Sequence, residues 1–332
     1  MDDLYERIAV NTSNMSSSFN TQNTNSKISR VFSNDDVAVP ISSRASRNQS
    51  YSNKFADVKT AKSLNLFIDE YPQSSFFSLL DSLQFNNDIE RIDVFRKRTT
   101  NEEIRTRTSD DMDTLFHVIR NLSNLVELVL WNFHPEDLSS FCLGIADHLS
   151  IGNLQLHMEC GTLDNQSAEA IASMPSLVSL ELEVNESFPV WSLLESKSMV
   201  LLGVVSNSFD FEANDVLRLA GRIRTNSVLR VLDLEPRIPS WCIGAVMASL
   251  RFSHTSRLET FRFSCQNDSE DQGDACMAEI LKTIEYETPL RVLWNHSRES
   301  FSVSEGIRRK TMLAARRNPS LEQFHLFVES DE

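Results

Sequence analysis

Apolar residues recur along this chain in a short pattern, L-x-x-L-x-L, separated by longer segments. The clearest copies begin at Leu125, Leu177, Leu229 and Leu258. Looser copies begin at these positions: Ala61, Ile89, Ile151, Met199, Leu290 and Leu321. The ten starts lie about 29 residues apart on average, with individual steps between 22 and 36. Each copy alternates like a β-strand, so we expect its fourth and sixth positions to point into a core.

Segments with helical periodicity lie between these predicted strands. In residues 135–149, apolar residues recur at spacings of three and four, and Pro135, Glu136 and Asp137 suit a helix start. Further helices are predicted over 214–224, 239–251 and 274–284. One strand and helix leave an apolar face open until a neighbour stacks on it. The alternation therefore predicts a stacked parallel sheet with helices.

Residues 61–327 resemble leucine-rich repeats of the ribonuclease-inhibitor class, in which each repeat carries a full helix. The resemblance implies an α/β leucine-rich-repeat solenoid: a horseshoe with parallel strands on the concave face and helices on the convex face. A shallower helical solenoid or an unrelated α/β domain is the alternative. The family commonly places Asn or Cys eight residues after the first Leu. Here only Asn185 and Asn207 stand there, so no continuous asparagine ladder is expected.

The first 60 residues differ in composition from the rest of the chain. Fifteen of the twenty residues from 11 to 30 are Ser, Thr, Asn or Gln. Such a segment buries too little apolar surface to offset the entropy lost on ordering. We therefore expect a disordered tail over 1–60 and about ten degenerate repeats over 61–332.

The charge limits the classes of partner that fit this chain, and the cysteine usage limits the cellular compartment. The net charge is −15, and 25 basic and 41 acidic residues follow residue 60. An acidic body repels phosphate backbones, which argues against nucleic acid, although the charge also serves plain solubility. The five cysteines form no CxxC pair, as expected of thiols in a reducing compartment. With no secretory signal and no membrane-length apolar run, cytoplasm or nucleus is predicted.

Signatures of catalysis are missing from the sequence. No P-loop, GxGxxG, HExxH or GxSxG motif occurs. We therefore predict no enzymatic activity, no catalytic residue and no cofactor. His296 and His325 are expected near each other on the last two strands, but two imidazoles without a further ligand make a poor metal site.

The concave face offers the most specific candidate site. Side chains alternate along a strand, so the third, fifth and seventh positions of each copy face this cavity. Phe67, Phe95 and Trp131 hold the seventh position in the first three repeats and are predicted to form one aromatic row. The row is either a partner-binding surface or is covered by the tail or an irregular first repeat.

Acidic residues mark the same predicted face. Glu181, Glu183, Asp233 and Glu235 form an acidic centre, interrupted by the Leu201/Gly203/Val205 strand. It is suited to Lys or Arg of a partner, or is simply a solvated face. Glu127, on the strand of Trp131, completes the partner-binding candidates.

The sequence leaves the role of two charged segments undecided. The helix carrying Arg308, Arg309, Lys310, Arg316 and Arg317 is a basic patch, read either as a solvated outer face or as a contact for acidic regions. Residues 96–111 form a charged insertion that either carries contacts or is merely tolerated.

Together these features predict a non-catalytic intracellular scaffold that binds a protein partner on the concave face, with no nucleic acid or membrane involved. A regulator of a small GTPase, or of another signalling protein, is the alternative. A sensing solenoid that signals through a second protein is a third possibility.

Overall fold

Strands and helices alternate from Ser63 to His325 in the computed structural model of the protein. It describes residues 37–38, 58, 60–97, 107–158, 161–186, 189–206, 211–266, 269–286, 288–297 and 302–327. The strands are β1 (Val37–Ala38), β2 (Ser63–Phe67), β3 (Arg91–Phe95), β4 (Glu127–Phe133), β5 (Asn153–Met158), β6 (Ser179–Glu183), β7 (Leu201–Val205), β8 (Val231–Ile238), β9 (Thr260–Cys265), β10 (Val292–Asn295) and β11 (Gln323–His325). The helices are η3 (Ile68–Glu70), α2 (Gln73–Leu83), α3 (Ser109–Arg120), α4 (Pro135–Ile145), α5 (Asn165–Ser173), α6 (Val190–Leu193), α7 (Ala213–Thr225), α8 (Ser240–Arg251), α9 (Glu270–Ile284) and α10 (Glu305–Arg317).

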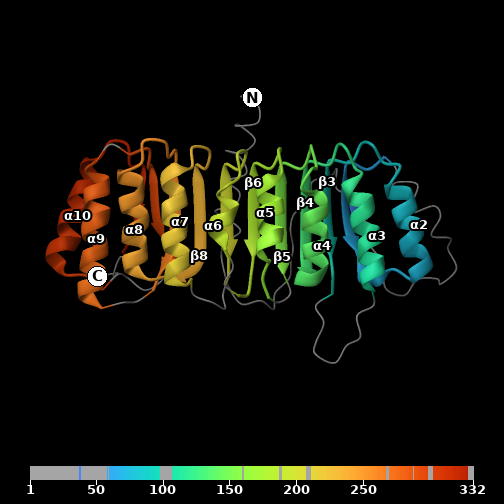
Figure 1. Ribbon diagram of the computed structural model, residues 1–332, viewed down its shortest axis with the longest axis horizontal. Coiled ribbons are helices and arrows are strands. Elements are labelled where there is room, and N and C mark those ends of the chain that lie inside the picture. The colour runs from blue at the N-terminus through green and yellow to red at the C-terminus, as the bar shows by residue number, and fades with distance from the viewer. Residues whose placement is uncertain are drawn as a thin grey trace. The chain divides into compact units, whose positions relative to one another are not determined.

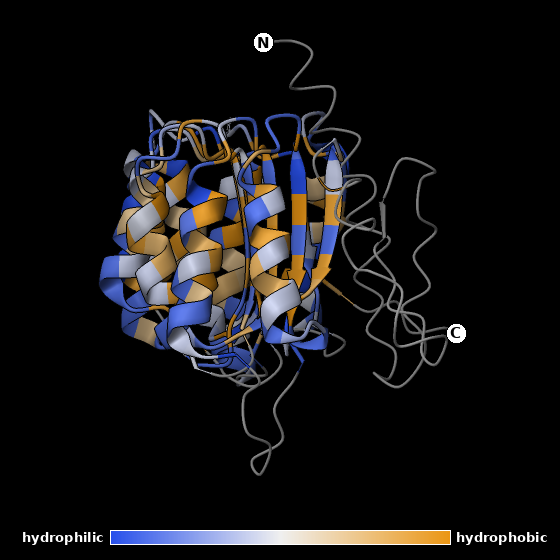
Figure 2. Ribbon diagram, turned by 90° about the vertical axis from the view of Figure 1, so that its right-hand side faces the viewer, coloured by the Kyte–Doolittle hydropathy of each residue, from blue (hydrophilic) through white to orange (hydrophobic). Residues whose placement is uncertain are grey.

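The strands pair in chain order, from β1 to β11, into one open sheet. Every pairing between described strands is parallel. The helices stand side by side on one face of this sheet, so strands and helices form two layers (Figures 1 and 2). This arrangement confirms the predicted α/β leucine-rich-repeat solenoid, and β2 to β11 fall on the ten predicted strand segments.

The core lies between the two layers. In β4, the side chains of Leu128 and Leu130, at the fourth and sixth positions, are fully buried. They belong to the same apolar cluster as Phe116 of α3 and Phe141 of α4. The helices carry matching buried stripes, as their periodicity predicts. The third, fifth and seventh positions are left on the opposite face, which we call the strand face.

Strand register follows the predicted repeat. Phe67 pairs with Phe95, and Phe95 with Trp131, so equivalent positions of neighbouring repeats lie side by side. The register holds even at Asn295, which a strict repeat would place in the core. Asn295 pairs with Phe263, and its side-chain oxygen accepts the Cys265 N–H at 3.1 Å. The amide is satisfied there by the neighbouring backbone.

The turns that leave the strands use a mixed set of polar side chains in place of an asparagine ladder. Asn185 donates to the Met158 carbonyl at 3.2 Å, at the predicted position. Asp69 accepts the Lys97 N–H at 2.8 Å. Asn132 has a left-handed φ of 60°, which Asn tolerates, and the register shifts between Trp131 and Phe133. This bulge places Phe133 fully in the core.

The turns that enter the strands carry a second series of polar side chains, which the L-x-x-L-x-L pattern does not predict. Each side chain donates to a carbonyl of the preceding repeat, and the donors are Asn86, Ser150, Ser198, Asn226, Ser253 and Asn318. The distances lie between 2.6 and 3.0 Å. A sequence signal exists, because Asn stands three residues before the first apolar position at Ile89, Leu229 and Leu321.

One strand pair falls inside the segment predicted to lack structure. Val37 and Ala38 pair with Leu64 and Asn65 and add β1 to the edge of the sheet. Val58 is also buried. Most of the remaining tail lies outside the described residues, as do Asn207 and residues 98–106 of the insertion.

Candidate functional site

The predicted aromatic row is a stack of rings on the strand face. The ring centroids of Phe67 and Phe95 lie 4.7 Å apart, and those of Phe95 and Trp131 lie 6.0 Å apart. The stack continues onto His157, whose ring centroid is 3.6 Å from that of Trp131. The row predicted from the sequence ended at Trp131 and did not include His157. His157 holds the seventh position of the fourth repeat, and this position is the sequence signal for its place in the row.

His157 connects the ring row to the acidic centre. Its Nδ1 lies 2.9 Å from Oε2 of Glu183, the next residue along the seventh-position row. Because an ionised carboxylate only accepts hydrogen bonds, this geometry assigns the proton to Nδ1. The His157 side chain is 8% exposed, and its Nε2 has no hydrogen-bond partner among the described residues. Aromatic and acidic surfaces therefore form one continuous strip.

The acidic centre spans three strands. Glu181 of β6 pairs across with Gly203 of β7, which in turn pairs with Asp233 of β8. Asp233 is buried and contacts Nε2 of His296 at 2.7 Å and the Arg262 guanidinium at 3.4 Å. The four acidic candidates thus gather around one strand whose central residue lacks a side chain.

The geometry separates Glu127 from this centre. Glu127 accepts a hydrogen bond from Arg91 at 2.8 Å, and Arg91 also holds Asp93 through two contacts of 3.0 Å. These three residues form a local ion-pair cluster on β3 and β4. Glu127 therefore lies beside the ring row, at a distance of several strands from the other acidic candidates.

His296 follows β10 and His325 lies on the neighbouring β11, but the two histidines contact different residues. His325 stacks against Trp294, with ring centroids 4.1 Å apart, whereas His296 contacts Asp233. Within the described ranges, no group of three or more His, Cys, Asp or Glu side chains is arranged to hold a metal ion.

Glu235 differs from the other carboxyls of the centre. Burial raises the pKa of Glu235 to about 7, with the nearby imidazole of His296 lowering it and the carboxylates of Asp233, Glu181 and Glu183 raising it further. No described residue makes an ion pair or hydrogen bond with Glu235. This carboxyl is therefore held where its charged form is poorly stabilised.

We expect Glu235→Gln to stabilise the protein at pH 8 but hardly at pH 4. A carboxyl whose pKa is higher in the folded than in the unfolded state lowers stability as the pH rises, here between 4.5 and about 7. Allowing for partial solvent screening, the gain at pH 8 is about 1–2 kcal/mol. Urea unfolding at both pH values measures it. An equal effect at pH 4 and pH 8 would contradict the assignment.

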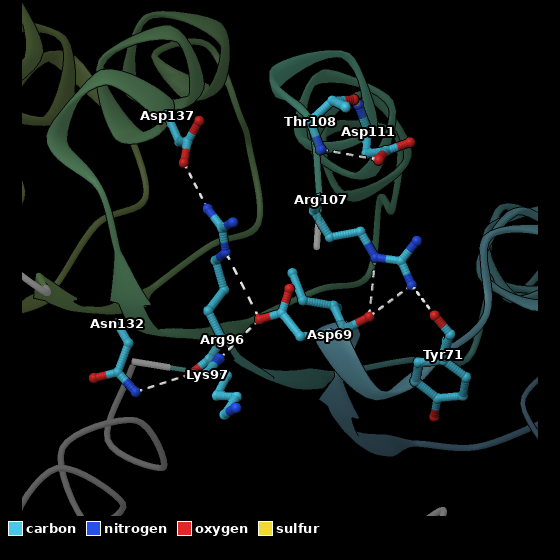
Figure 3. A network of polar contacts seen from close by, with 10 residues as sticks. Asp69, Tyr71, Arg96, Lys97, Arg107, Thr108, Asp111, Asn132 and Asp137 are labelled. Carbon is cyan, nitrogen blue, oxygen red and sulfur yellow. Dashed lines mark hydrogen bonds and ion pairs between the residues drawn. The ribbon is translucent and has the colours of Figure 1, made fainter. Parts of the chain in front are cut away.

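Two arginines of the charged insertion, Arg96 and Arg107, are buried against neighbouring turns (Figure 3). Arg96 donates to Asp137 at 2.7 Å and lies 4.0 Å from Asp69, with all three side chains less than 10% exposed. Arg107 donates to the carbonyls of Ile68 and Tyr71. These contacts hold the turns next to Phe67 and Phe95, at the strand ends of the ring row.

Comparisons with known proteins give fold neighbours only. No family model matches the chain, and no curated protein matches it. Among solved structures, an internalin C2 from Listeria monocytogenes is 14% identical, with a TM-score of 0.38 over 73% of this chain and 84% of that one. A second Listeria monocytogenes internalin, InlF, is 10% identical, with a TM-score of 0.32 over 75% of this chain and 83% of that one. The chain's own repeat of strand, turn and helix gives it the fold of an α/β leucine-rich-repeat solenoid.

Proposed function

We propose that this chain is a non-catalytic scaffold that binds a protein partner on its strand face. The observation that carries this proposal is the continuous strip formed by the stacked rings and the acidic centre. Protein interfaces are enriched in such aromatic anchors, and charged groups at their margin fix orientation. The face is also built on paired strands, so its side chains are held in a fixed arrangement.

An intracellular location and the ribonuclease-inhibitor-like subclass are parts of the same proposal. Cys142, Cys242, Cys265 and Cys276 are buried free thiols, and burial raises the pKa of the Cys142 thiol. Such thiols suit a reducing compartment. Helices of three or more turns in most repeats support the subclass. No described helix is both long and apolar enough to cross a membrane.

We expect Phe95→Ala/Trp131→Ala to weaken partner binding by about 30-fold or more, because loss of a central aromatic anchor typically removes about 2 kcal/mol. The test selects binders for the full chain from a random peptide library and measures their affinities. Trp241→Ala is the matched control, since Trp241 is 41% exposed on α8 in the helix layer.

Peptides that bind the wild type and Trp241→Ala equally, but are lost with the double variant, support the strand face. Selected peptides that bind all three proteins alike overturn the placement of the site. If the folded full chain selects no peptide from the library, the scaffold function itself is overturned.

A further inference from the structure

The last described helix, α10, carries the basic patch noted in the sequence. Five of its 13 residues are Arg or Lys and one is Glu, so the helix has a net charge of +4 in a chain of net charge −15. It stands at the end of the helix layer, beside α9 (Figure 1). Thr311 and Ala315 are 0% and 7% exposed, so they mark the face of α10 that packs against the rest of the solenoid.

The opposite face of α10 has a small and apolar centre. Gly306 and Leu313 are seven residues apart, so they lie almost above one another on a helix of about 3.6 residues per turn. Leu313 is 42% exposed, and a Cβ built on Gly306 would meet nothing described within 4 Å. We call this pair the α10 seam. The space over the seam is open to a group from a partner.

Basic residues line both sides of the α10 seam. At about 100° per residue, Arg309 and Arg316 lie on one side of it. Lys310 and Arg317 lie on the other side, and all four residues, which we call the basic flanks, are exposed. Within each flank the two residues are seven positions, or about 11 Å, apart along the helix. A seam flanked by charges at this spacing is the arrangement by which helices pair in coiled coils.

The described residues supply no counterion for the basic flanks. None of the ion pairs between described residues involves a flank residue. Arginines of two other helices are paired within the chain. Arg222 of α7 contacts Glu195 at 2.5 Å, and Arg251 of α8 contacts Glu279 at 2.9 Å. The basic flanks therefore differ from these arginines in being available to carboxylates of another molecule.

Helix stability accounts for only half of the basic flanks. Arg316 and Arg317 lie in the last turn, where cations interact favourably with the helix dipole. Arg309 and Lys310 lie in the first half of the helix, where the dipole gives no such gain. The acidic Glu305 of the first turn forms no ion pair with any described residue. Carboxylates of a partner would stabilise the charges of Arg309 and Lys310.

Three features of this surface define the class of partner that fits it. The basic flanks require negatively charged groups, and the seam requires an apolar side chain that packs on Leu313. The seven-residue spacing recurs along one face of a second helix. An acidic amphipathic helix has all three properties. A nucleic acid or an anionic membrane has only the first, and the acidic body of the chain repels phosphate groups.

We propose that α10 binds an acidic amphipathic helix of a partner protein, with an apolar side chain against Leu313 and Asp or Glu residues against both basic flanks. Packed helices lie about 8–10 Å apart, and the absence of a side chain at Gly306 favours such a close approach. This surface lies in the helix layer, so it is separate from the strand face and does not depend on the function proposed there.

The first experiment measures the binding of three synthetic helical peptides to the full chain. On an Ala/Gln host, the first peptide carries a Leu with Glu three and four positions before and after it. The second has the same four Glu on the opposite helix face, and the third has Gln in their place. We expect the first peptide to bind about tenfold or more tightly than the third and several-fold more tightly than the second, with an affinity that falls as salt rises. Equal affinity for the first peptide and either of the others overturns the proposal.

The second experiment reverses one end of the basic flanks. Arg309→Glu/Lys310→Glu should weaken the first peptide about tenfold or more, and a peptide with Lys in place of the two Glu at one end should recover several-fold. Lys197→Glu/Arg257→Glu is the matched control, because it makes the same change of charge at two exposed residues outside α10. It should stay within about threefold of wild type, since salt screens distant charges. Equal weakening by the two double variants overturns the proposal.

Further outcomes identify a different occupant of α10 or a different site for the peptide. Loss of the first peptide in Phe95→Ala/Trp131→Ala would place it on the strand face, which overturns this inference and leaves the proposed function standing. Tighter binding of duplex DNA or anionic lipid vesicles that Arg309→Glu/Lys310→Glu abolishes would show that α10 recognises phosphate groups, which overturns the inference. Dimers of the full chain that the same variant dissociates would show that a second copy occupies α10, with the same consequence.

Discussion

Arg107→Ala is expected to lower the free energy of unfolding by about 3–5 kcal/mol, the range for removing one member of a buried charged network. Arg107 is only 3% exposed. Its guanidinium donates to the Ile68 carbonyl at 2.8 and 3.0 Å, to the Tyr71 carbonyl and to Gln73 at 2.8 Å. The guanidinium carbon also lies 4.1 Å from the ring centroid of Phe76. Truncation removes these donors from the Ile68 and Tyr71 carbonyls and opens a cavity beside the ring.

Two further variants serve as controls for this prediction. Arg107→Met keeps most of the side-chain volume, so recovery of stability in this variant would assign the loss to packing alone. Lys62→Ala removes a surface ion pair with Glu90, whose side chains are 74% and 58% exposed, and should change stability by less than about 1 kcal/mol. Urea unfolding compares all three. A loss in Arg107→Ala no larger than in Lys62→Ala contradicts a structural role for the arginine.

The strand layer was predictable because the pattern that determines the buried face lies within each strand segment. At Leu128 and Leu130, alternation alone assigns the buried face, and the same alternation repeats in every copy. A slip of one residue would expose these side chains, so the apolar pattern fixes the register. Helix bounds followed within a few residues for the same reason: α4 begins at the predicted Pro135 and ends at Ile145, before the predicted 149.

The turns were less predictable, because each can be closed by several side chains. The strand-exit turns are bridged by Asp69 and Asn185, which share one position in their repeats, and by Asn132 and Asn295, which stand at two others. What they share is a bond to a backbone group of a neighbouring repeat, a property that no fixed spacing reveals. The bulge at Asn132 follows from a single backbone conformation and changes which following residue enters the core.

The candidate site was predictable in its rows but not in its side-chain partners. Because side chains alternate along a strand, the shared seventh position predicted that Phe67, Phe95 and Trp131 lie side by side. The contact between Asp233 and His296 joins residues 63 positions apart and depends on rotamers that reach across a whole strand. The use of these groups for binding a partner remains a prediction, tested by the peptides described above.

Phe116→Ala is expected to destabilise the N-terminal repeats by about 3–5 kcal/mol, the usual effect of removing a fully buried aromatic ring. Phe116 is 0% exposed, and its ring centroid lies 4.6 Å from that of Phe141 and 5.7 Å from that of Phe133. These three rings come from α3, α4 and β4 and fill the space between two repeats. Phe116→Leu, the control, keeps much of the volume and should lose about 1–2 kcal/mol.

The loss should also be local, because each repeat of a solenoid contacts mainly its neighbours. Hydrogen exchange can show this: amides of β3 and β4 should lose protection in Phe116→Ala, while those of β9 keep theirs. Since Phe95 and Trp131 stand on the loosened strands, library peptides that need the ring row should bind more weakly even though neither ring is changed. Equal loss of protection in β9 would show instead that the whole array unfolds as one unit. The strands of the ring row would then open only when the entire solenoid unfolds.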